Sequence, residues 1–146
     1  GSYIYQERCR AFFRALRIHH LEDDRELAGH SDDLNQCLEV HLPRLLERGC
    51  TAIQCSHDLL AREVLLRCLA LGKAVPGDVS ILGIDDLPVC RELTPTLSSI
   101  RQDRTELGKS AYYALNSQIH HVHISCLKLH SELILRGSVG QRQAAP

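Results

Sequence analysis

Three short groups of polar residues stand where the chain could carry out chemistry. They are Ser56-His57-Asp58, Asp85-Asp86 and Arg101-Gln102-Asp103, and each directly follows a run of residues that predicts a buried strand. Because ligands of open parallel sheets bind outside the carboxyl ends of the strands, we expect these side chains to line the rim of one crevice. Their carboxylate, imidazole and amide groups suit hydrogen bonding to a small polar molecule.

The same residues form only a weak catalytic pattern. His57 and Asp58 beside Ser56 suggest nucleophilic catalysis, but the members of a triad are rarely neighbours in sequence, and no nucleophile elbow surrounds the serine. A hydrolase that uses His57 and Asp85 therefore remains an alternative to a binding protein. Capping of helices or turns explains three of the acids: Asp58, Asp78 and Asp86.

Two further groups contain residue types that bind metals. His120-His121 and His123 lie close to Cys126, but this run falls in a predicted loop and has no carboxylate partner. The acids in Gly29-His30-Ser31-Asp32-Asp33 are explained by the capped start of a helix. We therefore predict a surface loop at the first group, a helix start at the second, and neither a metal ion nor a cofactor.

The composition is that of an ordinary globular domain. The chain has 146 residues, a formal net charge of −1, 44% hydrophobic and 24% charged residues. This near-neutral balance offers no basic surface for nucleic acid, and no apolar run reaches the ~18 residues of a membrane-spanning helix. Seven scattered cysteines without a C-x-x-C pair predict reduced thiols in the cytoplasm, with Cys37, Cys55 and Cys68 buried. Gly1-Ser2 is expected to be a cloning scar.

Hydrophobic periodicity predicts alternating helices and strands around the polar groups. Helices are expected over 5–16, 59–71 and 104–117, a loop over 17–30, and strands over 51–56, 79–84, 97–100 and 127–136. A further helix is capped by Ser31 or Asp32, kinked by Pro43 and ended by Gly49. Buried strands alternating with helices are typical of a parallel α/β sheet. Residues 137–146 are predicted to form a disordered tail.

Five segments carry a resemblance to a known family: R-C-R-A-F-F-R-A-L from Arg8, T-A-I-Q-C-S-H-D-L-L-A from Thr51, G-K-A-V-P-G-D-V-S-I-L-G-I-D-D from Gly72, L-T-P-T-L-S-S-I-R-Q-D from Leu93, and E-L-I-L-R-G-S from Glu132. They resemble segments of the LacI/GalR family of bacterial transcriptional repressors. The match falls in the carboxyl-terminal half of the family's effector-sensing domain. That domain has the fold of periplasmic sugar-binding proteins.

The resemblance implies effector-binding roles for four residues. Arg8 matches an arginine that hydrogen-bonds effector hydroxyls, and Asp85 matches the first acid of the G-x-D-D turn, which accepts such bonds. His57 stands where the family usually has Asn, and Gln102 matches a polar residue close to the pocket. His30 stands where the family places a stacking aromatic. No catalytic and no metal-binding residue is implied.

A sugar-like effector fits these residue types. Arg8 and Asp85 can each make charge-assisted hydrogen bonds to uncharged hydroxyls, worth about 1.5–3 kcal/mol apiece. His57 is the departure from the family, because a neutral imidazole has one donor and one acceptor whereas the charged ring has two donors. The histidine therefore favours a different effector, such as an anionic one, or pH-sensitive binding.

The resemblance also implies that the chain is part of a larger sensor. The fold class is then an α/β, parallel-sheet, periplasmic-binding-protein-like (type I) subdomain, truncated at its N-terminal side. Residues 3–136 would be its carboxyl-terminal part, with 104–120 on the side of the missing amino-terminal subdomain. A homodimer is expected through 59–71, apolar nearly all round, and 86–93. Operator DNA would bind only through a domain absent here, and no membrane is involved; the alternative is a solute-binding protein of a transport system.

Overall fold

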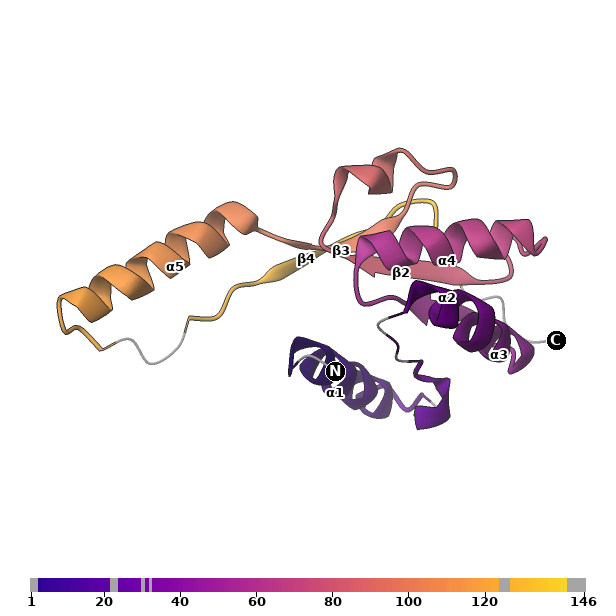
Figure 1. Ribbon diagram of the computed structural model, residues 1–146, viewed down its shortest axis with the longest axis horizontal. Helices are drawn as coiled ribbons and strands as arrows, with labels where there is room; N and C mark the ends of the chain where they lie inside the picture. The colour runs from indigo at the N-terminus through magenta and orange to yellow at the C-terminus, as the bar shows by residue number, and fades with distance from the viewer. Residues whose placement is uncertain (1–2, 22–23, 30, 32, 124–126, 142–146) are drawn as a thin grey trace.

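The computed structural model describes residues 3–21, 24–29, 31, 33–123 and 127–141 of the chain. Its centre is a four-stranded sheet in the order β1-β2-β3-β4, formed by β1 (Ala52–Gln54), β2 (Ser80–Ile84), β3 (Ser98–Gln102) and β4 (Ser131–Ile134). Figure 1 labels β2, β3 and β4. β1, β2 and β3 run parallel, and β4 is antiparallel to β3. The predicted α/β fold with a parallel sheet is therefore correct, with one antiparallel strand added at its edge.

Helical segments connect and cover the strands. They are α1 (Tyr3–Ile18), the 3-10 turn η1 (Arg25–Leu27), α2 (Leu34–Gln36), η2 (Cys37–His41), α3 (Leu42–Glu47), α4 (Asp58–Ala70), the 3-10 turn η3 (Pro88–Arg91) and α5 (Arg104–Ile119). The cap of α2 is Asp33, whose carboxylate accepts a hydrogen bond from the backbone N–H of Asn35 at 2.9 Å. Ser31 was expected in that role but instead accepts the N–H of Asp33. None of the described helices is long and apolar enough to cross a membrane.

The helical turn that precedes Pro43 has an irregular hydrogen-bond pattern. Immediately before Pro43, η2 is a π-helical turn, in which the N–H of Leu42 donates to the carbonyl of Cys37, five residues back. Proline has no N–H to continue the regular ladder, and a widened turn is one way to accommodate that loss. The kink predicted at Pro43 thus takes the form of a π-helical insertion between α2 and α3.

One face of the sheet carries the core. Ile53, Ile81 and their neighbours at alternate positions point to this face, where Leu65 and Cys68 of α4 are fully buried against them. Six described cysteines are free thiols. Burial raises the pKa of Cys55 to about 12 and also raises that of Cys68, so both thiols are neutral and unreactive. These two match the predicted buried cysteines, whereas Cys37 is only half-buried.

The helix α4 is buried on one side only. Ala61, Leu65 and the residues in line with them contact the sheet, whereas Leu59, Leu66 and Leu69 are exposed. The sequence predicted burial on several sides, because almost every position is apolar. Within the described chain no second element covers the outer face, so that expectation is wrong for the chain by itself.

The end of the chain is more ordered than its sequence indicates. Ser138 is fully buried: its Oγ donates to the carbonyl of Ile81 at 2.6 Å and accepts the N–H of Ser98 at 2.8 Å. Its backbone also bonds Thr96 and Ile81. The prediction of a disordered tail from residue 137 is therefore wrong for 137–141, because Ser138 supplies hydrogen bonds that two strands need; 142–146 lie outside the described residues.

We predict that Gly83→Ala destabilises the fold by about 1–3 kcal/mol, the range for overpacking a core. A Cβ on Gly83 would overlap Asp58 Oδ1 and press on Ala61. The matched control is Gly108→Ala in α5, where a Cβ meets open space and the change should stabilise by about 1 kcal/mol. Urea denaturation of both variants measures this; equal effects of the two substitutions would contradict the packing described.

Candidate functional site

The buried carboxylate of Asp58 links the segments that follow β1 and β2 to β3. Asp58, which follows β1, has no exposed surface. Its Oδ1 accepts a hydrogen bond from Ser99 Oγ on β3 at 2.6 Å, and its Oδ2 accepts one from the backbone N–H of Leu87, just after β2, at 2.7 Å. Asp58 therefore acts structurally, although not as the expected cap of α4, a role that His57 takes, and it is too enclosed to meet a ligand.

Asp85 and Asp86 form an unusual turn at the end of β2. Their φ angles are 107° and 48°, in the left-handed region that side-chain-bearing residues seldom adopt. Three hydrogen bonds hold this backbone: Asp85 N–H to Ile100 O at 2.9 Å, Asp86 N–H to Ser99 Oγ at 3.0 Å, and Arg104 Nη2 to Asp85 O at 3.0 Å. Strain maintained in this way is common at ligand-binding sites, where it presents a side chain in a fixed direction.

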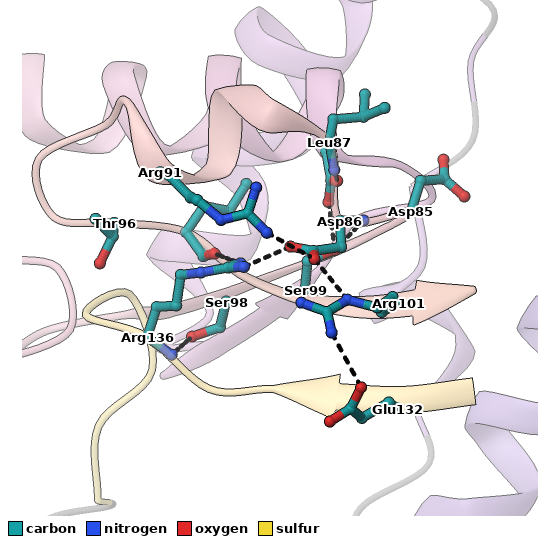
Figure 2. Close-up of polar contacts among 12 residues, drawn as sticks. Asp85, Asp86, Leu87, Arg91, Thr96, Ser98, Ser99, Arg101, Glu132 and Arg136 are labelled. Carbon is teal, nitrogen blue, oxygen red and sulfur yellow. Dashed lines mark hydrogen bonds and ion pairs between the residues drawn. The ribbon is translucent and has the colours of Figure 1, made fainter. Parts of the chain in front are cut away.

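Asp86 is the centre of an arginine cluster (Figure 2). Its side chain is only 3% exposed and accepts hydrogen bonds from Arg136 Nη2 at 2.5 Å, Arg101 Nε at 2.8 Å and Arg91 Nη2 at 3.3 Å. Arg101 also pairs with Glu132 at 3.2 Å. Burial opposes ionisation, but the hydrogen bonds and charges of Arg136 and Arg101 outweigh it and hold the pKa of Asp86 below its usual value.

This cluster is the feature that sequence reasoning missed. Arg136 lies fifty positions after Asp86, and only the pairing of β3 with β4 and the turn after it bring the two together. The signal in the sequence was the arginine of the segment E-L-I-L-R-G-S, to which no role had been given. The capping role expected for Asp86 is thus replaced by a larger one, the ion-pair centre that anchors the end of the chain.

Asp85 has the opposite orientation to its neighbour. Figure 2 shows its side chain pointing away from the arginines that surround Asp86. Among the residues that the structure describes, no hydrogen bond or ion pair to the Asp85 carboxylate is present, and the residue is half-buried. The turn thus separates two adjacent acids, one neutralised inside the protein and one available at its surface.

Arg8 and His57 meet at the end of β1. Arg8 Nη1 on α1 donates to the carbonyl of Ser56 at 2.5 Å. His57 is exposed and caps α4, its Nδ1 accepting the N–H of Leu60 at 3.1 Å. Both residues line a cleft of about 820 Å³ whose wall is formed by α1, the η2–α3 segment and the sheet.

Two of the four predicted binding residues therefore share a cleft and two lie beside it. Asp85 and Gln102 follow or end the next two strands, β2 and β3, and do not line the cleft. Gln102 pairs with Ser131 of β4 and is half-buried. All four lie at the carboxyl edge of the parallel strands or, for Arg8, contact it. His30 lies outside the described residues.

The described part of the chain shows no cluster of three or more His, Cys, Asp or Glu side chains that could hold a metal ion. His120 and His121 are exposed, at the end of α5, and Cys126 of the same sequence group lies outside the described residues. Asp78, the third acid expected to cap a turn, does so by accepting the N–H of Ala74 at 2.7 Å.

Comparison with known proteins identifies the family. The family model described as "Periplasmic binding protein-like domain" matches residues 1–139. The chain belongs to this family. The carboxyl edge of its parallel sheet, where the Asp85–Asp86 turn lies, is thus part of a periplasmic-binding-protein-like domain, as the resemblance implied.

The relatives of this periplasmic-binding-protein-like chain are regulators of transcription. The HTH-type transcriptional repressor PurR of Aliivibrio salmonicida is 28% identical over 144 residues, which cover 92% of this chain and 41% of the repressor. The crystal structure of the Escherichia coli transcriptional repressor ascG is 27% identical with a TM-score of 0.80, covering 94% of this chain and 51% of that one. A complex of the transcriptional regulator CelR with cellobiose is 26% identical with a TM-score of 0.77, covering 90% and 42%.

These relatives confirm the resemblance to the LacI/GalR family, and solved structures named as LacI-family regulators are among the matches. The chain spans about 41% of the length of the PurR relative and about half of the ascG chain. The match therefore covers an effector-binding domain in part, and the relatives PurR and CytR are named as transcriptional repressors.

We predict that Asp86→Asn costs about 3 kcal/mol of stability near neutral pH, because it leaves the largely buried guanidinium of Arg136 without its carboxylate. The lowered pKa of Asp86 also makes stability pH-dependent: the contribution of the carboxylate is complete above the ordinary pKa of an unfolded Asp, about 3.9, and is lost as the pH falls through the lower folded value.

Urea unfolding at a series of pH values below 5 measures this second effect. The wild-type chain should lose more stability over this range than Asp86→Asn, whose amide does not titrate. Glu47→Gln, at an exposed site on α3, is the control and should follow the wild type. Parallel pH profiles for wild type and Asp86→Asn would refute the role of the cluster.

Proposed function

We propose that this chain is the effector-binding and dimerising part of a cytoplasmic LacI-type transcriptional regulator. In the parent protein a small molecule, sugar-like in its hydroxyl groups, binds at the carboxyl edge of β1, β2 and β3. Its binding shifts the two halves of the sensor and so changes the spacing of paired DNA-binding segments. The parent makes and breaks no bond, and DNA is contacted only outside this chain.

The observation that carries the proposal is the Asp85–Asp86 turn. Three hydrogen bonds and the arginine cluster hold a strained backbone that leaves the Asp85 carboxylate without a partner among the described residues. Arg8 and His57 lie one strand away, at the end of β1. The relative CelR was solved with cellobiose, a ligand rich in hydroxyls, which supports the same ligand class for this chain.

The exposed helix α5 supports a partner subdomain in the parent. Figure 1 shows α5 projecting away from the sheet, and none of its residues is buried. Leu107, Tyr112 and Leu115 are exposed by half or more. An apolar face of this kind is costly in water. We assign residues 104–120 to the side of an amino-terminal subdomain; the match covers 41% of the PurR relative and 51% of the ascG chain, so these relatives are long enough to contain one.

The outer face of α4 supports a homodimer. Leu59, Leu66 and Leu69 are spaced so that they form one apolar stripe, with exposures of 53%, 40% and 37%. The segment 86–93 lies next to it, since η3 contacts α4. The three leucines lie on one side of the helix, with the ion pair Arg62–Glu63 in the turn between Leu59 and Leu66, and an isologous interface would pair this surface with its copy.

The two other functions fit the geometry less well. A hydrolase would use His57 and Asp85, but the Nδ1 of His57 is engaged as the cap of α4, and Asp85 does not line the cleft that His57 lines. If the chain came from a solute-binding protein of a transporter, we would expect its relatives to be solute-binding proteins. PurR, ascG and CelR are instead regulators of transcription. Neither alternative has an observation in its favour.

We predict that Asp85→Asn weakens effector binding by tenfold or more, the equivalent of one charge-assisted hydrogen bond. The effector is first found by thermal-shift screening of sugars, sugar phosphates and nucleosides on the full-length protein. Affinity is then measured by calorimetry, with Glu47→Gln as a distant acidic control that should bind like the wild type. His57→Asn should change affinity or specificity; an unchanged affinity in both variants would refute this site.

We predict that Leu66→Glu converts a dimeric chain to a monomer, because it places a charge in the centre of the apolar stripe. Sedimentation velocity at several concentrations gives the mass. Leu34→Glu changes an equally exposed leucine of α2 and should leave the dimer intact. A monomeric wild-type chain, or dimers in both variants, would contradict an interface on α4.

A further inference from the structure

The second face of the sheet is incompletely covered. Parallel sheets are normally buried on both faces. Here one face packs on α4, while Ala52, Leu82 and Ile84, on the opposite face, line the cleft of about 820 Å³. Phe12 and Leu16 of α1 stand across the cleft from them. A cavity of this size and apolar character is typical of a site for a small organic molecule rather than for water.

One end of this cleft carries an unneutralised positive charge. Arg8 donates one hydrogen bond, to the carbonyl of Ser56, and within the described residues no carboxylate pairs with it. A guanidinium has five N–H donors, so most of those of Arg8 remain available. The exposed His57 also lines the cleft, and its Nδ1 is already occupied. An anionic group next to these residues would be bound by electrostatic attraction and by directed hydrogen bonds from the guanidinium of Arg8.

His41 forms part of the wall of the same cleft. Both of its ring nitrogens are buried, and neither has a hydrogen-bond partner in the described part of the chain. Its ring packs against Gly29, where a Cβ would clash. Because both nitrogens are closed to water, His41 shapes the cleft and offers a ligand no hydrogen bond.

From this geometry we propose that the cleft between α1 and the sheet binds an organic anion with an apolar body. Arg8 pairs with its acidic group, and Leu82, Ile84 and Phe12 enclose its hydrocarbon or aromatic part. The inference deepens the proposed function, on which it rests, because it assigns an amphipathic acid as a ligand next to the hydroxyl-binding edge at Asp85. A neutral sugar alone would leave the apolar wall exposed.

Two fluorescent probes that differ by one acidic group test the proposal on the chain. They are 1-anilinonaphthalene-8-sulfonate and N-phenyl-1-naphthylamine, which share an aromatic body, and only the first carries a sulfonate. Arg8→Gln should weaken binding of the sulfonate by about tenfold and change that of the neutral probe less than twofold. Arg8→Lys should restore most of the difference. Leu82→Trp, which places a larger ring in the apolar wall of the cleft, should weaken binding of both probes.

Matched controls lie outside the cleft. Arg14→Gln alters an exposed arginine on the same helix, and Leu34→Trp adds the same ring at an exposed site, so both should bind the probes like the wild type. Circular dichroism verifies that each variant folds. If Arg8→Gln does not fold, the two single variants Arg8→Lys and Leu82→Trp are sufficient to test the proposal. Equal affinity for the two probes, or binding unaffected by Leu82→Trp, would overturn the proposal.

The two proposals can fail separately. If effector affinity depends on Asp85 but not on Leu82, the proposed regulator function is supported and the apolar cleft is refuted as a ligand site. Probe binding that depends on Arg8 and Leu82, without any effector sensitive to Asp85, would preserve the cleft and refute the hydroxyl-binding edge. If the screened effector displaces the sulfonate probe, the effector binds in the cleft as well as at Asp85.

Discussion

The buried carboxylate of Asp58 is the interaction on which the site depends. A charge with no exposed surface is costly unless it is fully hydrogen-bonded, and here Ser99 and the backbone of Leu87 supply the bonds. Those two partners belong to different strands from the one that delivers Asp58. One side chain therefore links the segments that follow β1 and β2 to the second residue of β3, and the close approach of Gly83 leaves that carboxylate no room to move.

Two adjacent acids receive different roles because the backbone turns between them. Asp86 faces inward, where Arg136, Arg101 and Arg91 neutralise it and tie the last strand to the turn. Asp85 faces outward with its carboxylate unpaired in the described structure (Figure 2). The ion-pair cluster thus stabilises the positive φ angles that an effector site at Asp85 requires.

Three surfaces of this chain lack the cover that their apolar residues call for. The outer face of α4 is proposed to meet a second copy, the projecting α5 is proposed to pack on an amino-terminal subdomain, and the cleft under α1 is proposed to hold a small molecule. Each surface corresponds to a different kind of partner. A regulator that couples a ligand to the arrangement of two subunits needs all three to communicate.

The sequence by itself determined the order of helices and strands, the parallel sheet, the capping role of Asp78 and the family, because these depend on local periodicity, turn residues and short motifs. It also placed Asp85, Gln102 and the residues after β1 at one edge, since strand ends share an edge in a parallel sheet. Only the tertiary structure assigned Asp86 to Arg136, fifty positions away, and ordered Ser138 against β2. The tertiary structure also showed that one side of α4 is exposed and that a cleft lies beside Arg8. Burial depends on which elements pack against a segment, and the local sequence does not specify those elements.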